Sequence, residues 1–189
     1  MASSFKGAYK TILTELGDSL AKIDEGEVEH LIDCIVESEG IFVVGAGRVG
    51  LMLHSFAMRL FHLGFRSHIV GSTTCPPIGS QDLLIVASSS GETATVRELV
   101  GKASREKAEI IAITATPDST IAGLASSVLF VEAPSTLQAG EEGALVSQQP
   151  MKTLFEQSLF VLLESMVLCI MHKTGQGAGD MAQRHANLE

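Results

Sequence analysis

The residues from Asp82 to Ala87 form a short, mostly apolar run that includes the β-branched Ile85 and Val86, and three serines and a glycine follow it. Such a run is typical of a buried strand. A helical pattern of apolar residues follows it, at Val96, Leu99, Val100 and Ala103. A strand, a short turn and a helix in this order predict an α/β fold with a parallel sheet.

The same alternation extends along the chain after two initial helices. We expect strands at 41–44, 67–70, 82–87, 110–114 and 127–131, and helices at 5–23, 28–36, 49–63, 93–106, 121–125 and 150–173. Pro150 is expected as the first residue of the last helix. This pattern predicts a five-stranded parallel sheet flanked by helices, of flavodoxin-like strand order 2-1-3-4-5.

We expect residues 1–189 to form one domain, which suits a chain of this length. Its parts are the N-terminal helices (1–38), an α/β core (39–149), the last helix (150–174) and a glycine-rich C-terminal tail (175–189).

Composition narrows the choice of partner and compartment. The net charge is −9, which argues against a nucleic-acid or anionic membrane surface. The most apolar stretch, Leu159 to Met171, is too short to span a bilayer. Cys34, Cys75 and Cys169 read as reduced cytoplasmic thiols. They have no metal-like spacing, and the six histidines form no HxxxH or HExxH pattern, so we expect no metal.

The turn after the central strand, Ser88 to Thr93, predicts a phosphate site. The free N–H groups and the dipole of a helix favour an anion at its N-terminus. Hydroxyls of Ser88, Ser90 and Thr93 add donors, each contributing roughly 1.5–3 kcal/mol toward a charged acceptor. The alternative is an ordinary serine-rich helix cap.

A second turn, Gly45-Ala46-Gly47-Arg48-Val49-Gly50, matches the GxGxxG fingerprint of dinucleotide-binding proteins. That fingerprint expects an acidic residue about 20 residues later, at the end of the second strand. The sequence there is Val70-Gly71-Ser72-Thr73-Thr74, which contains no acidic residue and so argues against a dinucleotide site. We therefore expect these glycines to let the backbone approach a small ligand, with Arg48 near a phosphate or a sugar hydroxyl. A solvated helix start is the alternative for Arg48.

The last helix is apolar on nearly every face between Leu159 and Met171. One small sheet covers only one side of such a helix, so we expect a homo-oligomer. The alternative is a helix enclosed in a crowded monomer core.

Acid–base candidates on pattern alone are Glu156 on this helix, Glu141 and Glu142 before it, and His185 in the tail.

The turn Ser88-Ser89-Ser90-Gly91-Glu92-Thr93 resembles the S-x-S-G-E-T phosphate signature of sugar isomerase (SIS) domains. Within that superfamily the chain is similar to the 6-phospho-3-hexuloisomerases. The resemblance is carried by Gly45–Arg48, Phe56–Leu60, His62–Phe65, Val70-Gly71 with Thr73-Thr74, Gln149–Met151, Leu154–Glu156 and the ending Arg184–Glu189.

The resemblance implies reversible isomerisation of D-arabino-3-hexulose 6-phosphate and D-fructose 6-phosphate through an enediol, in the ribulose monophosphate route of formaldehyde fixation. It implies a phosphorylated ketohexose as ligand, no metal or redox cofactor, and a cytoplasmic homotetramer. Glu156 matches the catalytic base, and His185 matches an assisting group that reaches a neighbouring subunit. The implied substrate contacts are Gly47, Arg48, Val49, Ser88, Ser89, Ser90, Gly91, Glu92 and Thr93.

Two positions depart from the family pattern. Val49 stands where the family commonly has a serine that touches the substrate, and Ser89 stands where the family often has glycine. Two alternatives remain open: another SIS isomerase, such as one acting on arabinose 5-phosphate, and a sensor that binds a sugar phosphate without turnover.

Overall fold

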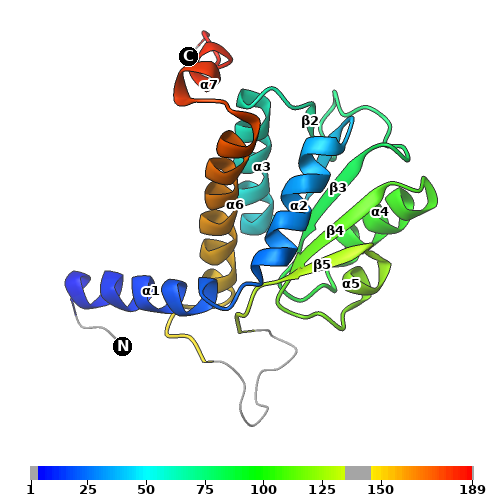
Figure 1. Ribbon diagram of the computed structural model, residues 1–189. Coiled ribbons are helices and arrows are strands. Elements are labelled where there is room, and N and C mark those ends of the chain that lie inside the picture. The colour runs from blue at the N-terminus through cyan, green and yellow to red at the C-terminus, as the bar shows by residue number, and fades with distance from the viewer. Residues whose placement is uncertain (1–3, 135–145, 189) are drawn as a thin grey trace.

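The computed structural model describes residues 4–134 and 146–188. Within them the chain forms a parallel sheet of five strands in the order β2-β1-β3-β4-β5 (Figure 1). The strands are β1 (Ile41–Val44), β2 (Ser67–Ile69), β3 (Leu83–Ala87), β4 (Glu109–Thr114) and β5 (Ser127–Phe130). The predicted fold class and strand order are confirmed.

Helices cover both faces of the sheet (Figure 1). One face packs against α2 (Glu25–Glu37), α3 (Gly47–His62) and α6 (Thr153–Thr174), and the other against α4 (Ala94–Arg105) and α5 (Thr120–Leu124). Alternate residues of each strand enter the two cores: Ile41 and Val43 face α2, α3 and α6, whereas Phe42 and Val44 face α4 and α5. Burial on both sides explains why the inner strands β1 and β3 are continuous apolar runs.

The remaining helices lie at the ends of this layer. α1 (Phe5–Leu20) runs past the start of α6 and projects away from the sheet (Figure 1). A helix that the sequence analysis missed, α7 (Ala178–Gln183), lies near the other end, beside the end of α3. Its six residues are too few to show helical periodicity, so the segment read as a glycine-rich tail.

The last helix begins later than predicted, because Pro150 is not its first residue. α6 starts at Thr153, whose N–H and hydroxyl both donate to the carbonyl oxygen of Pro150. Met151 between them has a φ of +59°, outside the helical region. Pro150 therefore begins a tight turn that leads into the helix.

α6 has 22 residues and is long and apolar enough, by length and composition only, to cross a membrane. The stretch Leu159 to Met171, which the sequence analysis expected to be too short to span a bilayer, lies within this longer helix. Half of its apolar window is buried within the fold, as in the core helix of a globular protein. Phe160 and Leu168 nevertheless stay exposed on its outer side.

The start of α3 packs closely against the end of β1 through two glycines. A Cβ added to Gly50 would lie 2.8 Å from the carbonyl oxygen of Gly45, and one added to Gly45 would lie 3.0 Å from Leu53. These glycines therefore serve helix–strand packing, and the expectation that they admit a ligand is not supported for this pair.

Replacing Gly50 with alanine will force backbone atoms apart. We expect Gly50→Ala to lower the free energy of unfolding by about 1–3 kcal/mol in urea denaturation, because the added methyl group meets main chain that cannot rotate away. Gly17→Ala is the control, since nothing lies within 4 Å of a Cβ there. An equal loss in both variants would contradict this explanation.

Candidate active site

The two glycine-containing turns leave the sheet side by side. β1 and β3 are neighbours, and Val44 pairs with Val86 near the ends of these strands. The chain order reverses between them, since β2 lies beyond β1 and β4 beyond β3. Such a switch point is where open parallel sheets bind ligands. The predicted convergence of Gly45–Gly50 and Ser88–Thr93 on one crevice follows from this pairing.

Three of the helices that start at this edge lack side-chain caps. α3, α4 and α6 begin after Ala46, Thr93 and Lys152, none of which makes a cap hydrogen bond. In contrast, α1, α2 and α5 are capped by Ser4, Asp24 and Ser119. Uncapped first-turn N–H groups are free to donate to an external anion. The difference favours anion binding and argues against the ordinary serine-rich cap as the reading of the turn after β3.

The hydroxyls of the serine turn face one another across that turn. Ser88 Oγ lies 3.2 Å from Thr93 Oγ1 and accepts a hydrogen bond of 3.1 Å from the N–H of Gly91. Ser90 Oγ accepts a longer bond of 3.4 Å from the N–H of Glu92. These contacts fix the three hydroxyls that the sequence analysis proposed as phosphate donors.

Ser89 is held differently. Its carbonyl oxygen accepts three bonds, from the N–H of Ala115 and the hydroxyls of Thr114 and Thr116. Its own hydroxyl is buried and has no hydrogen-bond partner in the described part of the chain. A buried hydroxyl without a partner is costly, so this donor is an additional candidate for ligand binding.

Gly91 and Glu92 fasten the turn to α5. Gly91 has a φ of +62°, and a Cβ there would fall 1.8 Å from Ser119 Oγ, so only glycine fits. The Glu92 carboxylate accepts hydrogen bonds from the N–H and hydroxyl of Thr120 and from Arg97. The Thr120 bonds, aided by Arg97, hold the pKa of Glu92 below its usual value. Glu92 thus positions the turn.

Arg48 and Glu156 meet at the same edge of the sheet. Arg48 lies in the first turn of α3 and Glu156 in the first turn of α6, and Arg48 Nε is 2.6 Å from Glu156 Oε2. The Glu156 side chain is 14% exposed, against 59% for Arg48. A nearly buried carboxylate paired with a guanidinium is held in one orientation. The solvated helix start considered for Arg48 is therefore replaced by an ion pair.

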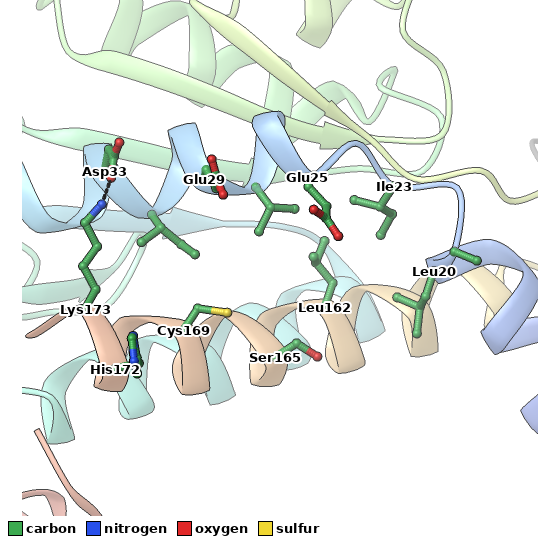
Figure 2. Close-up of a pocket in the computed structure, with 13 residues that line it drawn as sticks. Leu20, Ile23, Glu25, Glu29, Asp33, Leu162, Ser165, Cys169, His172 and Lys173 are labelled. Atoms are coloured by element: carbon green, nitrogen blue, oxygen red, sulfur yellow. Dashed lines mark hydrogen bonds and ion pairs between the residues drawn. The ribbon is translucent and has the colours of Figure 1, made fainter. Parts of the chain in front are cut away.

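A hollow of about 290 Å³ adjoins this ion pair. Besides Arg48 and Glu156 it is lined by Ile12, Leu16, Met52, Gln157, Phe160 and Val161. A separate hollow of about 830 Å³ lies between α2 and α6, where Leu162 and Cys169 of α6 lie opposite α2 and the Asp33–Lys173 ion pair lies at one end (Figure 2). That second hollow is away from the serine turn.

Glu15 is a residue that the sequence analysis overlooked. Its carboxylate in α1 accepts bonds from the Ser147 hydroxyl, the Gln148 N–H and the Gln149 side chain. Burial alone would raise the pKa of Glu15, but these three bonds outweigh it and lower the pKa. Glu15 thereby positions the segment that leads into Glu156. From the sequence, Glu15 reads as a solvated helix residue. Only the family-like Gln149-Pro150 segment, which its carboxylate binds, could have drawn attention to this part of the chain.

Val49 and Gly47, in the turn after β1, differ in whether they can contact a ligand. Val49 is 8% exposed and packs in the core, so it does not present a side chain where the family serine would. Gly47 has a φ of +58°, and a Cβ there would meet nothing within 4 Å. Gly47 is therefore the glycine of this turn that leaves room for a ligand.

His185 lies far from this site in the same chain. Its ring stacks on His62 at 5.2 Å, and Arg184 donates to the His62 carbonyl oxygen. His62 ends α3, about 21 Å of helix away from Arg48 at a rise of about 1.5 Å per residue. Within one chain the two predicted catalytic residues are therefore not brought together. Glu141 and Glu142 lie outside the described residues.

Comparison with known proteins agrees with this geometry. Residues 35–163 match the SIS domain family. The chain is 41% identical over 178 residues to a 3-hexulose-6-phosphate isomerase of Bacillus subtilis, covering 94% of this chain and 95% of the relative. It is 42% identical to the 3-hexulose-6-phosphate isomerase of Mycobacterium gastri, covering 93% and 86%.

A solved structure shows the same relationship. A Methanococcus jannaschii protein, whose crystal structure was taken to infer a 3-hexulose-6-phosphate isomerase function, superposes with a TM-score of 0.79. It is 33% identical, and the match covers 96% of both chains. The chain therefore belongs to the SIS domain family and, within it, to the family of the 3-hexulose-6-phosphate isomerases.

Proposed function

We propose that this protein interconverts D-arabino-3-hexulose 6-phosphate and D-fructose 6-phosphate. The observation that carries the proposal is the Arg48–Glu156 pair at the sheet edge where the serine turn begins α4. The serine turn fits a phosphate, and the Arg48–Glu156 pair supplies a positioned carboxylate. The names of the relatives, at 41–42% identity over nearly the whole chain, supply the substrate.

In the proposed mechanism the serine turn holds the phosphate and Glu156 acts as the base. The Glu156 carboxylate takes the proton from C2, the C2–H electron pair forms the C2=C3 double bond, and the carbonyl π pair moves onto O3. The O2 proton then passes to O3, the O2–H electron pair forms the C2=O bond, and the C2=C3 pair takes the first proton back from Glu156 at C3, which places the carbonyl at C2. A positioned base of this kind contributes about 10²–10⁴-fold.

Arg48 has two uses in this scheme. Its guanidinium orients the Glu156 carboxylate, and it is exposed enough to reach a substrate oxygen that becomes negatively charged in the enediolate. The reaction moves a proton within the sugar without net oxidation, so its balance needs no redox cofactor.

We further propose that the active unit is a homo-oligomer, a tetramer by the family resemblance. Large apolar side chains stay exposed on the outer sides of α1, α3 and α6: Phe5, Leu13, Leu51, Met58, Phe61, Phe160 and Leu168. Association of copies would cover them. The same arrangement is the only way in which His185, held at the far end of α3, reaches a serine turn, namely that of a neighbouring subunit.

The pathway and compartment proposed are the ribulose monophosphate route and the cytoplasm. The three cysteines fit that compartment, because none of them forms a disulfide.

The activity is tested by a coupled assay. A synthase makes 3-hexulose 6-phosphate from ribulose 5-phosphate and formaldehyde, and the appearance of fructose 6-phosphate is followed with EDTA present. We expect turnover under these conditions, because the mechanism uses only side chains. Absence of turnover, with fructose 6-phosphate still raising Tm, would instead identify a sugar-phosphate sensor.

Glu156→Gln will separate catalysis from binding. We expect kcat to fall at least about tenfold, and up to about 10⁴-fold, while fructose 6-phosphate still raises Tm. Glu164→Gln is the matched control, because Glu164 lies on the same helix and pairs with Arg59 at 3.6 Å. Unchanged turnover in Glu156→Gln would remove this residue from the mechanism.

Replacing both Ser90 and Thr93 with alanine will test the phosphate site. Loss of two hydroxyl donors weakens binding of substrate and transition state together, so we expect KM to rise at least about tenfold with a smaller change in kcat. Ser104→Ala serves as control, because Ser104 is an exposed residue of α4, the helix that follows this turn. If KM does not change, the phosphate binds elsewhere.

A further inference from the structure

Three side chains with metal-ligand chemistry meet near the opposite edge of the sheet. His30 and Cys34 stand one helical turn apart on α2, and Glu109 is the first residue of β4. Cys34 Sγ lies 3.8 Å from His30 Nε2 and 3.5 Å from Glu109 Oε1. Their ligand atoms all lie within 4.8 Å of one another.

We propose that His30, Cys34 and Glu109 bind a thiophilic divalent cation of the Zn²⁺ class. Tetrahedral zinc sites have Zn–S distances of about 2.3 Å and Zn–N or Zn–O distances of about 2.0–2.2 Å, which separates neighbouring ligand atoms by about 3.5 Å. The observed separations from the sulfur agree within a few tenths of an ångström. Three protein ligands leave a fourth position for water.

The charge around the sulfur favours a cation. A hollow of about 280 Å³ beside Cys34 is lined by four carboxylates, Glu37, Glu39, Asp82 and Glu109, together with Ser38, Ser80 and Gln81. Neither lysine nor arginine is among these lining residues. The carboxylates are therefore not neutralised by a cation of the hollow itself, and a bound metal ion would compensate them.

Cys34 itself is buried, with 7% of its surface exposed. Burial and the neighbouring carboxylates, Glu109 first among them, raise the pKa of its thiol to about 11, so without a metal it remains protonated. Binding of the cation displaces this proton to solvent and forms the metal–thiolate bond. No oxidation or further reactant is involved.

This site is distinct from the proposed active site. Glu109 begins β4 and Thr114 ends it, which places about 17 Å of strand between the cluster and the serine turn's edge. The cation joins α2 to β4, two elements that pack on the same core, and so stabilises the folded chain. A search for paired histidines or paired cysteines misses it, because the helix contributes one of each.

Cobalt binding tests the proposal with the full-length protein. The purified protein is stripped with EDTA, transferred to chelator-free buffer and titrated with CoCl2. We expect a thiolate-to-cobalt charge-transfer band that saturates at one equivalent and is abolished by ZnCl2. His30→Ala and Glu109→Gln, both at exposed side chains, should weaken binding at least tenfold each, and Cys34→Ser should remove the band.

Matched variants make the result specific. Cys169→Ser removes an exposed cysteine of α6 and should leave the band unchanged. Glu156→Gln should also leave it unchanged, so the site stands or falls independently of the proposed isomerase activity. A wild-type protein without the band, or a band that persists at full affinity in His30→Ala, would overturn the proposal.

Thermal unfolding gives a second readout. At a free Zn²⁺ concentration about a hundredfold above the dissociation constant, we expect Tm of the wild-type protein to rise by about 5 °C or more. The same addition should shift Tm of His30→Ala and Glu109→Gln much less. An equal rise in all three proteins would place the bound zinc elsewhere.

Discussion

The pairing of β1 with β3 is the contact on which the rest of the structure depends. It places Val44 beside Val86, so the two following turns emerge next to each other and their helices start at one edge. Because both faces of the sheet are buried, a shift of register would move apolar side chains between two differently shaped cores. The position of the serine turn relative to Arg48 is therefore fixed by core packing and not by contacts within the site.

The helices also differ in whether a side chain caps their N-terminus. Three helices, α1, α2 and α5, are capped by Ser4, Asp24 and Ser119. Where α3 and α4 start, no cap is made, and the fold retains unsatisfied donors at a cost in stability. Glu92 offsets part of this cost by binding the turn to Thr120. A ligand with a phosphate would satisfy what remains.

The candidate site was predictable where its residues are close in sequence. The serine turn and Arg48 each lie directly after a strand, and parallel strands place such turns at one edge. Glu156 was different, because its position depends on α6 packing against α3, more than a hundred residues away in sequence. Glu15 and the His30–Cys34–Glu109 cluster were missed for the same reason. Resemblance to a family named Glu156, but pattern alone did not distinguish it from Glu141 or Glu142.

The sequence by itself determined the α/β class, the strand order and the serine turn between β3 and α4, because strand and helix periodicities and turn residues are local properties of the chain. Only the tertiary structure decided that Gly45 and Gly50 serve packing, that Arg48 pairs with Glu156, and that His185 rests on His62 at the far end of α3. These facts depend on which helix faces lie against each other. That choice is made by burial of the whole apolar surface, which no single segment of the sequence encodes.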